Sequence, residues 1–299
     1  MSSRFIKHGE NPHSSRLVKA VEDLTKQWFS EKPDGVYGAV AVVICGGVTI
    51  ESRYLDLEFT VPFGDGTEAD EAEITIYNLT DDTINKFKKG VECSIEAGFR
   101  GDTGVIFRGI VSRVSTTFDN ADKITRIVCV DDMAERTITS RTYDTSKDSQ
   151  YILKDLLGET GLPIAVFSPR TTTKYDTTQT VDGYLMDNIQ KYAEDCGISV
   201  YINKGQIYAR YIKDGDNISF TVSENTGMIG SPTAFEEEQQ AEDFTETVNG
   251  YNIQMLLQHR ITTASIVNLS SMIASGQYRV RSGRHIFNES EAITEIEVI

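Results

Sequence analysis

Residues 71–132 decide the fold: EAEITIYNLTDDTINKFKKGVECSIEAGFRGDTGVIFRGIVSRVSTTFDNADKITRIVCVDD. Within this stretch the apolar side chains of Val91, Cys93, Ile95 and Ala97 alternate with polar ones. An alternation with a period of two is typical of a strand that buries one face. We therefore predict a strand here and another one before it at residues 73–77.

One compact helix is predicted between these two strands, over residues 81–88. Thr80 or Asp81 can cap its amino end, because a side-chain oxygen there accepts a hydrogen bond from a free backbone N–H group. Two lysines lie at its carboxyl end, where the helix dipole favours positive charge, and Gly90 ends it.

Two further strands follow this pair. After a turn at residues 101–104, strict alternation places on one side of the next strand Val105, Phe107, Gly109, Val111 and Arg113. A turn at residues 119–122 then leads to a strand over residues 124–130. Three antiparallel strands at this turn spacing favour a β-barrel or sandwich over a parallel α/β sheet.

The composition indicates a globular chain of two or three domains. It has 299 residues, of which 39% are hydrophobic and 25% are charged. No apolar run approaches the roughly 20 residues that a membrane helix needs, so we predict no membrane segment. The opening residues, MSSRFIKHGENPHSS, lack the apolar core of a secretory signal, which favours folding in a reducing cytoplasm.

The four cysteines fit such an environment. Cys45, Cys93, Cys129 and Cys196 form no CxxC pair, and no histidine lies near them in sequence. Because zinc sites need closely spaced Cys and His ligands, we expect buried, reduced thiols and no metal site.

The chain is acidic, with 29 basic residues against 45 acidic ones and a net charge of -16. Phosphate binding depends on Lys and Arg, so we predict no sequence-specific binding of nucleic acid. Two interpretations of the acidity remain open: carboxylates that keep DNA from sticking to a channel wall, or plain solubility.

Residues 1–36 are interpreted as an N-terminal arm. A stripe of apolar side chains at helical spacing predicts an amphipathic helix over residues 15–29, namely Leu17, Val21, Leu24 and Trp28. This helix can dock on a neighbouring subunit or pack against its own domain, and both interpretations stay open.

Residues 37–135 are predicted to form a first β-barrel domain. A continuous apolar run at residues 40–45 opens it, and residues 53–61 alternate in polarity like a strand. The strands within residues 71–132 complete it.

Residues 136–235 are predicted to form an α+β middle domain. Helical periodicity predicts one helix over residues 149–157, ended by Gly158, and a second over residues 183–196. A hairpin follows at residues 198–211.

Residues 236–299 are predicted to form a second β-barrel region, open to strands from the middle segment. Its first residues, EEEQQAED at 236–243, are interpreted as a solvated loop. Strands are predicted at residues 251–257, 265–269, 276–283 and 292–298. The expected fold class is mainly β with an α+β insertion: two tube-like antiparallel β-barrel domains joined by a small helical and hairpin domain.

No motif identifies an active site. The glycine-rich residues 98–104 precede a strand rather than a helix, so they are interpreted as a hairpin turn and not as a phosphate loop, and Arg100-Gly101-Asp102 as turn composition. His285, after a strand, is expected to be structural or exposed rather than catalytic, and residues 214–217 are expected to form a turn before a strand at 218–222. We assign no catalytic, cofactor-binding or metal-binding residue and expect no cofactor.

Several segments together resemble the tail hub proteins of phages, the class that caps the tail tube at the baseplate. The resemblance is carried by Tyr77-Asn78-Leu79, by Gly90 with Ala97-Gly98, and by Gly104-Val105-Ile106-Phe107-Arg108-Gly109-Ile110-Val111. Residues 149–153 with 160–163 resemble the helical insertion of that family, and residues 276–285 resemble a strand of its second barrel. The similarity spans roughly residues 37–299.

This resemblance implies two tube-like barrels per chain and a homotrimer, since three two-domain copies would match a six-fold tube to a three-fold spike. The implied partners are the tail tube protein and the central spike protein, with tape-measure and baseplate wedge proteins as further candidates. The implied location is the tail baseplate of a virion or tail-like particle, assembled in the cytoplasm of the bacterial host.

We therefore expect a non-enzymatic baseplate hub of a phage tail or of a contractile injection particle such as a headless bacteriocin. It would join the tail tube to the central spike and surround an axial channel. Two alternatives stay open: a tail-associated cell-wall hydrolase, which needs paired carboxylates or a Zn/Cys/His constellation in a cleft, and a host-surface carbohydrate-binding module, which needs an exposed aromatic platform.

Overall fold

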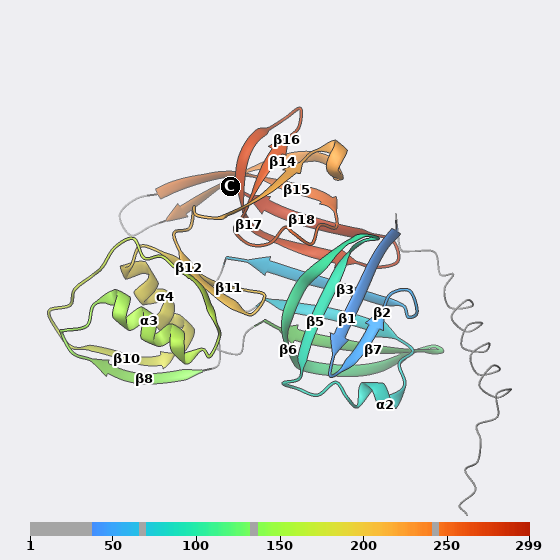
Figure 1. Cartoon of the computed structure of the whole chain (residues 1–299), viewed down its shortest axis with the longest axis horizontal. Helices are drawn as coiled ribbons and strands as arrows, with labels where there is room; N and C mark the ends of the chain where they lie inside the picture. The colour runs from blue at the N-terminus through green and yellow to red at the C-terminus, as the bar shows by residue number, and fades with distance from the viewer. Residues whose placement is uncertain (1–37, 66–69, 132–136, 241–244) are drawn as a thin grey trace, which may run out of the picture.

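The structure is a computed structural model that describes residues 38–65, 70–131, 137–240 and 245–299. Figure 1 shows two β regions, with a unit of helices and short strands to one side. The predicted N-terminal arm and its helix lie outside the described residues. The mainly β fold with an α+β insertion is confirmed.

The first β region covers the described part of residues 38–131, and the strands predicted within 71–132 are confirmed. Its elements are β1 (Ala39–Cys45), β2 (Val48–Glu51), β3 (Leu57–Gly64), β4 (Glu71–Tyr77), α2 (Asp81–Ile84), β5 (Glu92–Phe99), β6 (Asp102–Asp119) and β7 (Asp122–Val130).

Helix α2 is shorter than predicted. Thr80 caps it, since its side-chain oxygen accepts a hydrogen bond from the Thr83 backbone N–H at 3.3 Å. The helix ends at Ile84 instead of residue 88, and the chain then turns so that Phe87 is buried in the core. Burial of that ring outweighs the few further helical hydrogen bonds.

The strand predicted over residues 53–61 begins later, at Leu57. The backbone N–H groups of Tyr54 and Leu55 both donate to the carbonyl oxygen of Glu51, so these residues form a turn. Alternating polarity alone did not reveal it.

Strand β6 breaks its predicted alternation at two bulges. Ile106 has no partner between the pairs at Phe107 and Val105, and Ser112 has none between those at Val111 and Arg113. A bulge inserts one residue and moves every later side chain to the other face. Phe107 and Val111 are therefore buried, whereas Arg113, which was predicted to share their side, is exposed.

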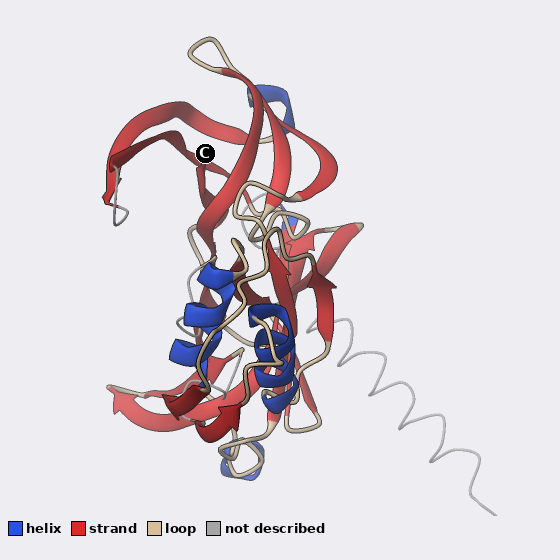
Figure 2. Cartoon of the chain, turned by 90° about the vertical axis from the view of Figure 1, so that its left-hand side faces the viewer, coloured by secondary structure: helices blue, strands red, loops and turns tan. Residues whose placement is uncertain are grey.

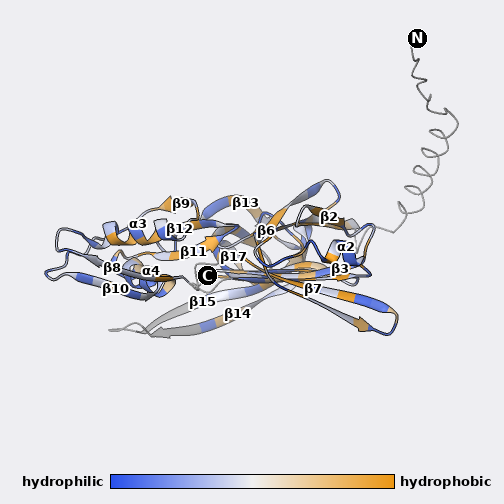
Figure 3. Cartoon of the chain, turned by 90° about the horizontal axis from the view of Figure 1, so that it is seen from below, coloured by the Kyte–Doolittle hydropathy of each residue, from blue (hydrophilic) through white to orange (hydrophobic). Residues whose placement is uncertain are grey.

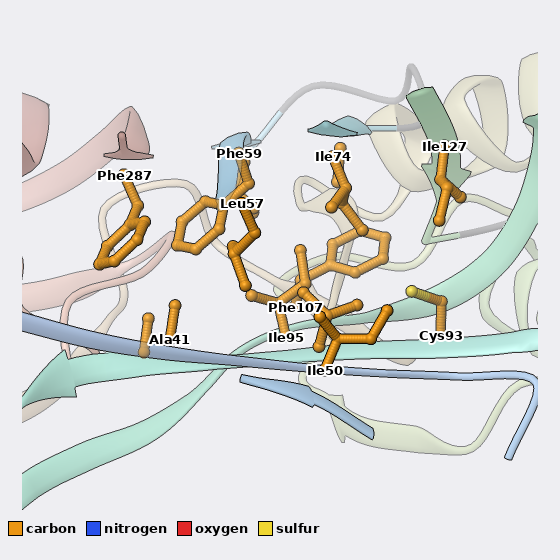
Figure 4. Close-up of a cluster of buried hydrophobic side chains, with 14 of the residues drawn as sticks. Ala41, Ile50, Leu57, Phe59, Ile74, Cys93, Ile95, Phe107, Ile127 and Phe287 are labelled. Atoms are coloured by element: carbon orange, nitrogen blue, oxygen red, sulfur yellow. The ribbon is translucent and has the colours of Figure 1, made fainter. Parts of the chain in front are cut away.

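The core of the first β region lies between two layers of strands. Figure 4 shows Leu57, Phe59 and Ile74 on one side of it and Ile95 and Phe107 on the other. Phe287, from the far end of the chain, also enters this core and stacks on Phe59 with ring centroids 5.3 Å apart. The first core is therefore completed by the second β region.

The α+β unit follows. Its elements are β8 (Ile138–Tyr143), α3 (Ser149–Glu159), β9 (Ile164–Phe167), β10 (Gln179–Tyr184), α4 (Leu185–Asp195), β11 (Ser199–Asn203) and β12 (Gln206–Arg210). Figure 2 shows the two longer helices beside each other. They bury Leu153, Leu156 and Ile189 in a core of their own.

Two predicted helix ends in this unit were wrong, whereas the β11–β12 hairpin is confirmed. Gly158 lies inside α3, and the positive φ of 74° falls on Gly161 instead. Gly183 belongs to β10, because its strand pairs with β8, so α4 begins at Leu185.

The second β region comprises β13 (Asp216–Val222), the 3₁₀ helix η3 (Glu224–Thr226), β14 (Met228–Gln240), β15 (Thr245–Leu256), β16 (Ser265–Ser270), β17 (Ser275–Phe287) and β18 (Ala292–Val298). Strands β13 and β14 start before residue 236 and pair within this region. The solvated loop predicted at residues 236–243 was wrong over 236–240, which continue β14 because they pair with β15.

The two β regions share one hydrogen-bonded sheet. Its order is β14-β15-β18-β17-β3-β4-β7-β6-β5-β1-β2, with β16 and β13 attached to β17. The junction is the antiparallel pairing of β17 with β3. Within the described residues no pairing returns from β2 to close a ring, so the sheet is strongly curved but open rather than two closed barrels.

Candidate functional site

One sheet face runs continuously across both β regions. Figure 3 shows β14, β15 and β7 along the lower edge of the view, with β17 and β3 next to them and β2, β6 and β13 toward the upper edge. The registers align the side chains on this face: Thr60 lies between Glu73 and Ile286, and Arg284 lies between Pro62 and Glu295. We call this surface the open face.

The open face is polar and carries charges of both signs. Among the described residues, its charged side chains include Glu58, Asp70, Glu71, Glu73, Glu295 and Glu297 with Arg113, Arg126, Arg281 and Arg284. The Arg284 Nε donates to a Glu295 oxygen at 2.5 Å, and Arg281 lies 3.2 Å from Glu297. The net charge of the chain is therefore not concentrated here.

A hollow of about 770 Å³ lies in the open face where β3, β14, β15, β17 and β18 meet. Asp70 lines it and accepts a hydrogen bond from the Gly64 backbone N–H at 3.1 Å. Burial raises the pKa of Asp70 to about 6. Gly283 keeps the floor of the hollow flat, because a Cβ atom there would meet the Glu295 carbonyl oxygen and the Phe63 ring.

His285 holds the junction between the two β regions. It lies inside β17 rather than at a strand end, opposite Val61 and Thr294, and it is 1% exposed. Its Nδ1 is 2.9 Å from the Thr294 hydroxyl, and its ring lies 4.9 Å from that of Phe63. Burial lowers the pKa of His285 to about 3, so the ring is neutral at pH 7. Its place inside a strand differs from the strand end predicted for it.

The glycine-rich turn makes a second connection between the β regions. The predicted hairpin is confirmed, with β5 and β6 joined at Arg100 and Gly101. Asp102 of this hairpin accepts hydrogen bonds from Arg260 and lies 3.1 Å from His259 Nε2. Gly104 is required here because a Cβ atom would clash with the His259 ring.

Two buried arginines connect the parts of the molecule: Arg210 ties the α+β unit to the second β region, and Arg279 ties the second β region to the first. Arg210, 5% exposed, makes a bidentate pair with Asp216 at 2.9 Å and donates to the Tyr201 hydroxyl. Arg279, 4% exposed, binds Asp65 at 2.6 Å and the Asp214 carbonyl oxygen at 3.2 Å. Such planar, multi-donor contacts favour a single arrangement of the parts that they join.

The other residues singled out in the sequence form no common site. All four cysteines are buried, as predicted. The acidic turn at 214–217 leads into β13, whose first residue is Asp216. Among the described residues no group of three or more His, Cys, Asp or Glu side chains is placed to hold a metal ion. None of the helices in the described ranges has the length and hydropathy to span a bilayer.

The sequence analysis did not predict the open face. Alternation along β3, β4 and β18 predicted a polar side for each strand, but it did not show that these sides lie on one surface. That depends on the pairing of β3 with β17, whose residues are more than two hundred positions apart in sequence. The sequence feature that could have indicated it is that polar and apolar side chains alternate both at residues 57–63 and at residues 293–298.

The comparisons with known proteins agree with this architecture. A 43 kDa tail protein of prophage MuSo2 from Shewanella oneidensis has a similar fold, with a TM-score of 0.63 and 8% identity over 87% of this chain and 97% of that one. A tail protein from Neisseria meningitidis MC58 gives a TM-score of 0.62 and 9% identity over 88% and 96%.

A third similar structure comes from E. coli. Its c3393 protein, described as a component of the type VI secretion system, gives a TM-score of 0.59 and 10% identity over 82% of this chain and 73% of that one. No curated protein sequence matches. The family "Baseplate hub gp41" matches residues 71–279, well over half of the chain. The chain therefore belongs to the baseplate hub gp41 family, and it is a structural protein of a phage tail baseplate.

Proposed function

We propose that this protein is a non-enzymatic adaptor that joins the tail tube to the central spike and surrounds an axial channel as a homotrimer. The observation that supports the proposal best is the open face, which continues from β15 across the junction to β7. A sheet face that carries mostly polar side chains is suited to line a water-filled space. Three copies with their open faces inward would surround such a channel.

The charge of the open face bears on what passes through it. The carboxylates there slightly outnumber the guanidinium groups, and Arg281 and Arg284 are paired with Glu297 and Glu295. Phosphate binding needs an excess of cations, which this face lacks, so a lumen built from it would not hold DNA tightly. We therefore propose a nearly neutral channel in place of a strongly acidic one.

The chemistry of the open face also supports an adaptor over a hydrolase. A glycosidase needs one carboxylic acid of raised pKa beside an ionised partner across a cleft. Asp70 has a raised pKa, but it is held by the Gly64 backbone, and Glu295 is held by Arg284. These contacts hold both carboxylates in structural hydrogen bonds or ion pairs.

The proposed partners follow from this role. The tube protein would meet one rim of the trimer and the spike protein the other, with tape-measure and wedge proteins as further candidates. The protein would reside in the baseplate and assemble in the host cytoplasm. The E. coli relative is described as similar to two phage T4 tail proteins, gp27 and gp5, which is consistent with a tail role.

Native mass spectrometry and electron microscopy of the purified chain test the proposal. We expect a ring-shaped trimer whose central hole is lined by β3, β17 and β18. A lasting monomer at tens of micromolar would contradict the trimer. A trimer whose reconstruction places the open face on the outside would contradict the channel alone.

A further inference from the structure

The hairpin of β16 and β17 ends in two exposed apolar side chains. Met272 and Ile273 lie at its turn and are 95% and 60% exposed, and Met272 is the most exposed large hydrophobic residue in the described parts of the chain. Turns usually have glycine, asparagine, aspartate, serine or proline at their central positions, so the turn itself does not require this apolar pair. We call Met272 and Ile273 the apolar tip.

Hydrogen bonds within the turn hold the apolar tip in one conformation. The Ser271 hydroxyl accepts hydrogen bonds from the backbone N–H groups of Ile273 and Ala274, at 3.3 and 3.0 Å. The Ser271 backbone N–H donates to the Ala274 carbonyl oxygen at 3.0 Å, and Ala274 is buried in the core of the second β region. A preorganised tip loses little conformational entropy when a partner covers it.

The apolar tip has no charged neighbour along the chain. Residues 261–278 contain no Asp, Glu, Lys or Arg, although 25% of the chain is charged. Burial of this end of the hairpin therefore takes none of its own charges out of water, a step that opposes association. The same property disfavours a lipid surface, because membrane-binding loops use Lys and Arg to attract anionic headgroups, and the chain has a net charge of -16. An apolar site on a protein is the better fit.

The hairpin points past one margin of the shared sheet. The sheet ends at β14, and Figures 1 and 2 show the turn of the β16–β17 hairpin at the top of the molecule, above β14 in Figure 1. Strand β13, the neighbour of β16, lies toward the upper edge of Figure 3, opposite to β14 and β15. The hairpin is therefore on the side of the sheet away from the open face.

The first β region presents a second free margin of the same sheet. Strand β6 pairs with β5 only as far as Ile110, and from Ser112 onward it pairs only with β7 among the described residues. The layer that carries the open face thus ends at β14 on one side and at this part of β6 on the other. Rotation of copies about a common axis brings two such margins next to each other.

Phe118 lies on this margin of β6 and is 73% exposed. Alternation along β6 places its ring on the side of Val114, which packs against the first core, and so away from the open face. The Lys123 ammonium lies 6.0 Å from the ring centroid and is held by Asp81 at 2.8 Å, so the described residues leave most of the ring uncovered. The apolar tip and Phe118 therefore share one side of the sheet.

We propose that the apolar tip of one copy packs against Phe118 of the next copy around the ring. A methionine sulfur beside an aromatic ring is a favourable contact, and burial of the three side chains removes exposed apolar surface from water. The contact joins two different surfaces, so it repeats from copy to copy and can close. The inference rests on the homotrimer of the proposed function and adds a contact between its copies.

Cysteine cross-linking of the full chain tests this contact. The four natural cysteines are buried, so cysteines introduced at the surface should react alone. A chain with Met272→Cys and Phe118→Cys, oxidised with copper phenanthroline, should give a covalent trimer on a non-reducing gel. Either change alone should give only traces of dimer, because each position faces the other kind in the next copy.

A matched control combines Met272→Cys with Tyr54→Cys, at another exposed ring of the first β region. It should give less than about a tenth of the covalent trimer, because a disulfide forms only over a narrow range of separations.

Serine variants measure the energetic weight of the contact. Met272→Ser with Ile273→Ser, and separately Phe118→Ser, should weaken self-association at least about tenfold in analytical ultracentrifugation. Ile138→Ser, at a residue that is 71% exposed on the α+β unit, is the control and should associate like wild type. Thermal melts report folding, and the serine variants suffice if a cysteine variant is unfolded.

Two results overturn the inference and leave the proposed trimer standing. One is a trimer in which the tip and Phe118 pair cross-links no better than the control, or in which the serine variants associate unchanged. The other is efficient dimer formation by Met272→Cys alone, which would show that tips meet each other. A wild-type chain that stays monomeric overturns both the inference and the trimer.

Discussion

Arg260 donates two hydrogen bonds to the carboxylate of Asp102, at 2.5 and 2.9 Å, although the two residues are 158 positions apart in the chain. The pair joins a hairpin tip of the first β region to the loop between β15 and β16. This contact gives the glycine-rich turn at residues 98–104 a structural role. With the β3–β17 pairing, it makes the two β regions one body.

Replacement of Asp102 by Asn tests this pair. Arg260 lowers the pKa of Asp102, so the pair stabilises the fold above the ordinary carboxyl pKa and loses this effect as the pH falls through the lowered value. Both side chains are 46% exposed, which limits the loss to about 0.5–1 kcal/mol at pH 7. Urea unfolding at pH 7 and pH 3 measures it.

The difference between Asp102→Asn and wild type should shrink toward zero at pH 3. Glu71→Gln, at an exposed carboxylate of the open face, is the control and should change stability little at either pH. A loss that persists undiminished in acid would show that the charge of Asp102 is not what stabilises the contact.

His285 predicts a second pH dependence. Its folded pKa of about 3 lies below the ordinary 6.5, so the unfolded chain binds the extra proton between these values. Stability should therefore fall as the pH drops from 6.5, by at most about 1.4 kcal/mol per pH unit from this group. The variant His285→Gln, which cannot titrate, should be less stable than wild type at pH 7 and approach it as the pH falls.

Protonation of Asp70 has the opposite effect on stability, so its contribution must be measured separately from that of His285. Its folded pKa of about 6 lies above the ordinary 3.8, so protonation on going from pH 6 toward 4 favours the folded state. Asp70→Asn should remove this gain. Equal slopes of stability against pH for His285→Gln and wild type would contradict the assignment to His285.

Gly283→Ala tests the flat floor of the junction. The added Cβ would lie against the Glu295 carbonyl oxygen and 2.6 Å from the Phe63 ring, and overpacking of this kind costs about 1–3 kcal/mol. Chemical denaturation should show that loss. Gly158→Ala, in α3 with open space around the glycine, should instead gain up to about 1 kcal/mol. The opposite ranking of these two variants would refute the packing described at β17.

The cysteines should be unreactive in the folded protein. Neighbouring thiols and burial raise the pKa of Cys45 and Cys93, and burial raises that of Cys196. The thiolate is the reactive form, so a thiol reagent such as dithionitrobenzoate should label none of the four natively and all four in denaturant. Rapid labelling of one thiol without denaturant would place that cysteine at the surface.

Local pattern predicted much of the fold. The alternation from Val91 to Ala97 became β5, and the turn at Lys204 and Gly205 became a hairpin tip. Patterns failed where tertiary pairing overrode them. The glutamates at 236–238 read as a loop by charge, yet their backbone pairs with β15. Ser112 looks like any strand residue, yet it forms a bulge that turns Arg113 outward.

The candidate surfaces were harder to predict, because each is built from segments distant in sequence. Glu73 and Ile286 flank Thr60 on the open face only because β3 lies between β4 and β17. The sequence predicts which side of each strand is polar, but it does not predict which strand lies beside it.

The place of β17 also governs when this chain can fold. Strand β3 is synthesised more than two hundred residues before its second neighbour β17, which also brings Phe287 to the first core. Until then β3 presents an unpaired apolar-faced edge, the kind of surface that aggregates. Contacts this distant in sequence also slow folding, because a long loop must close before they form. A chain interrupted before β17 would leave one edge of β3 unpaired and the first core without Phe287.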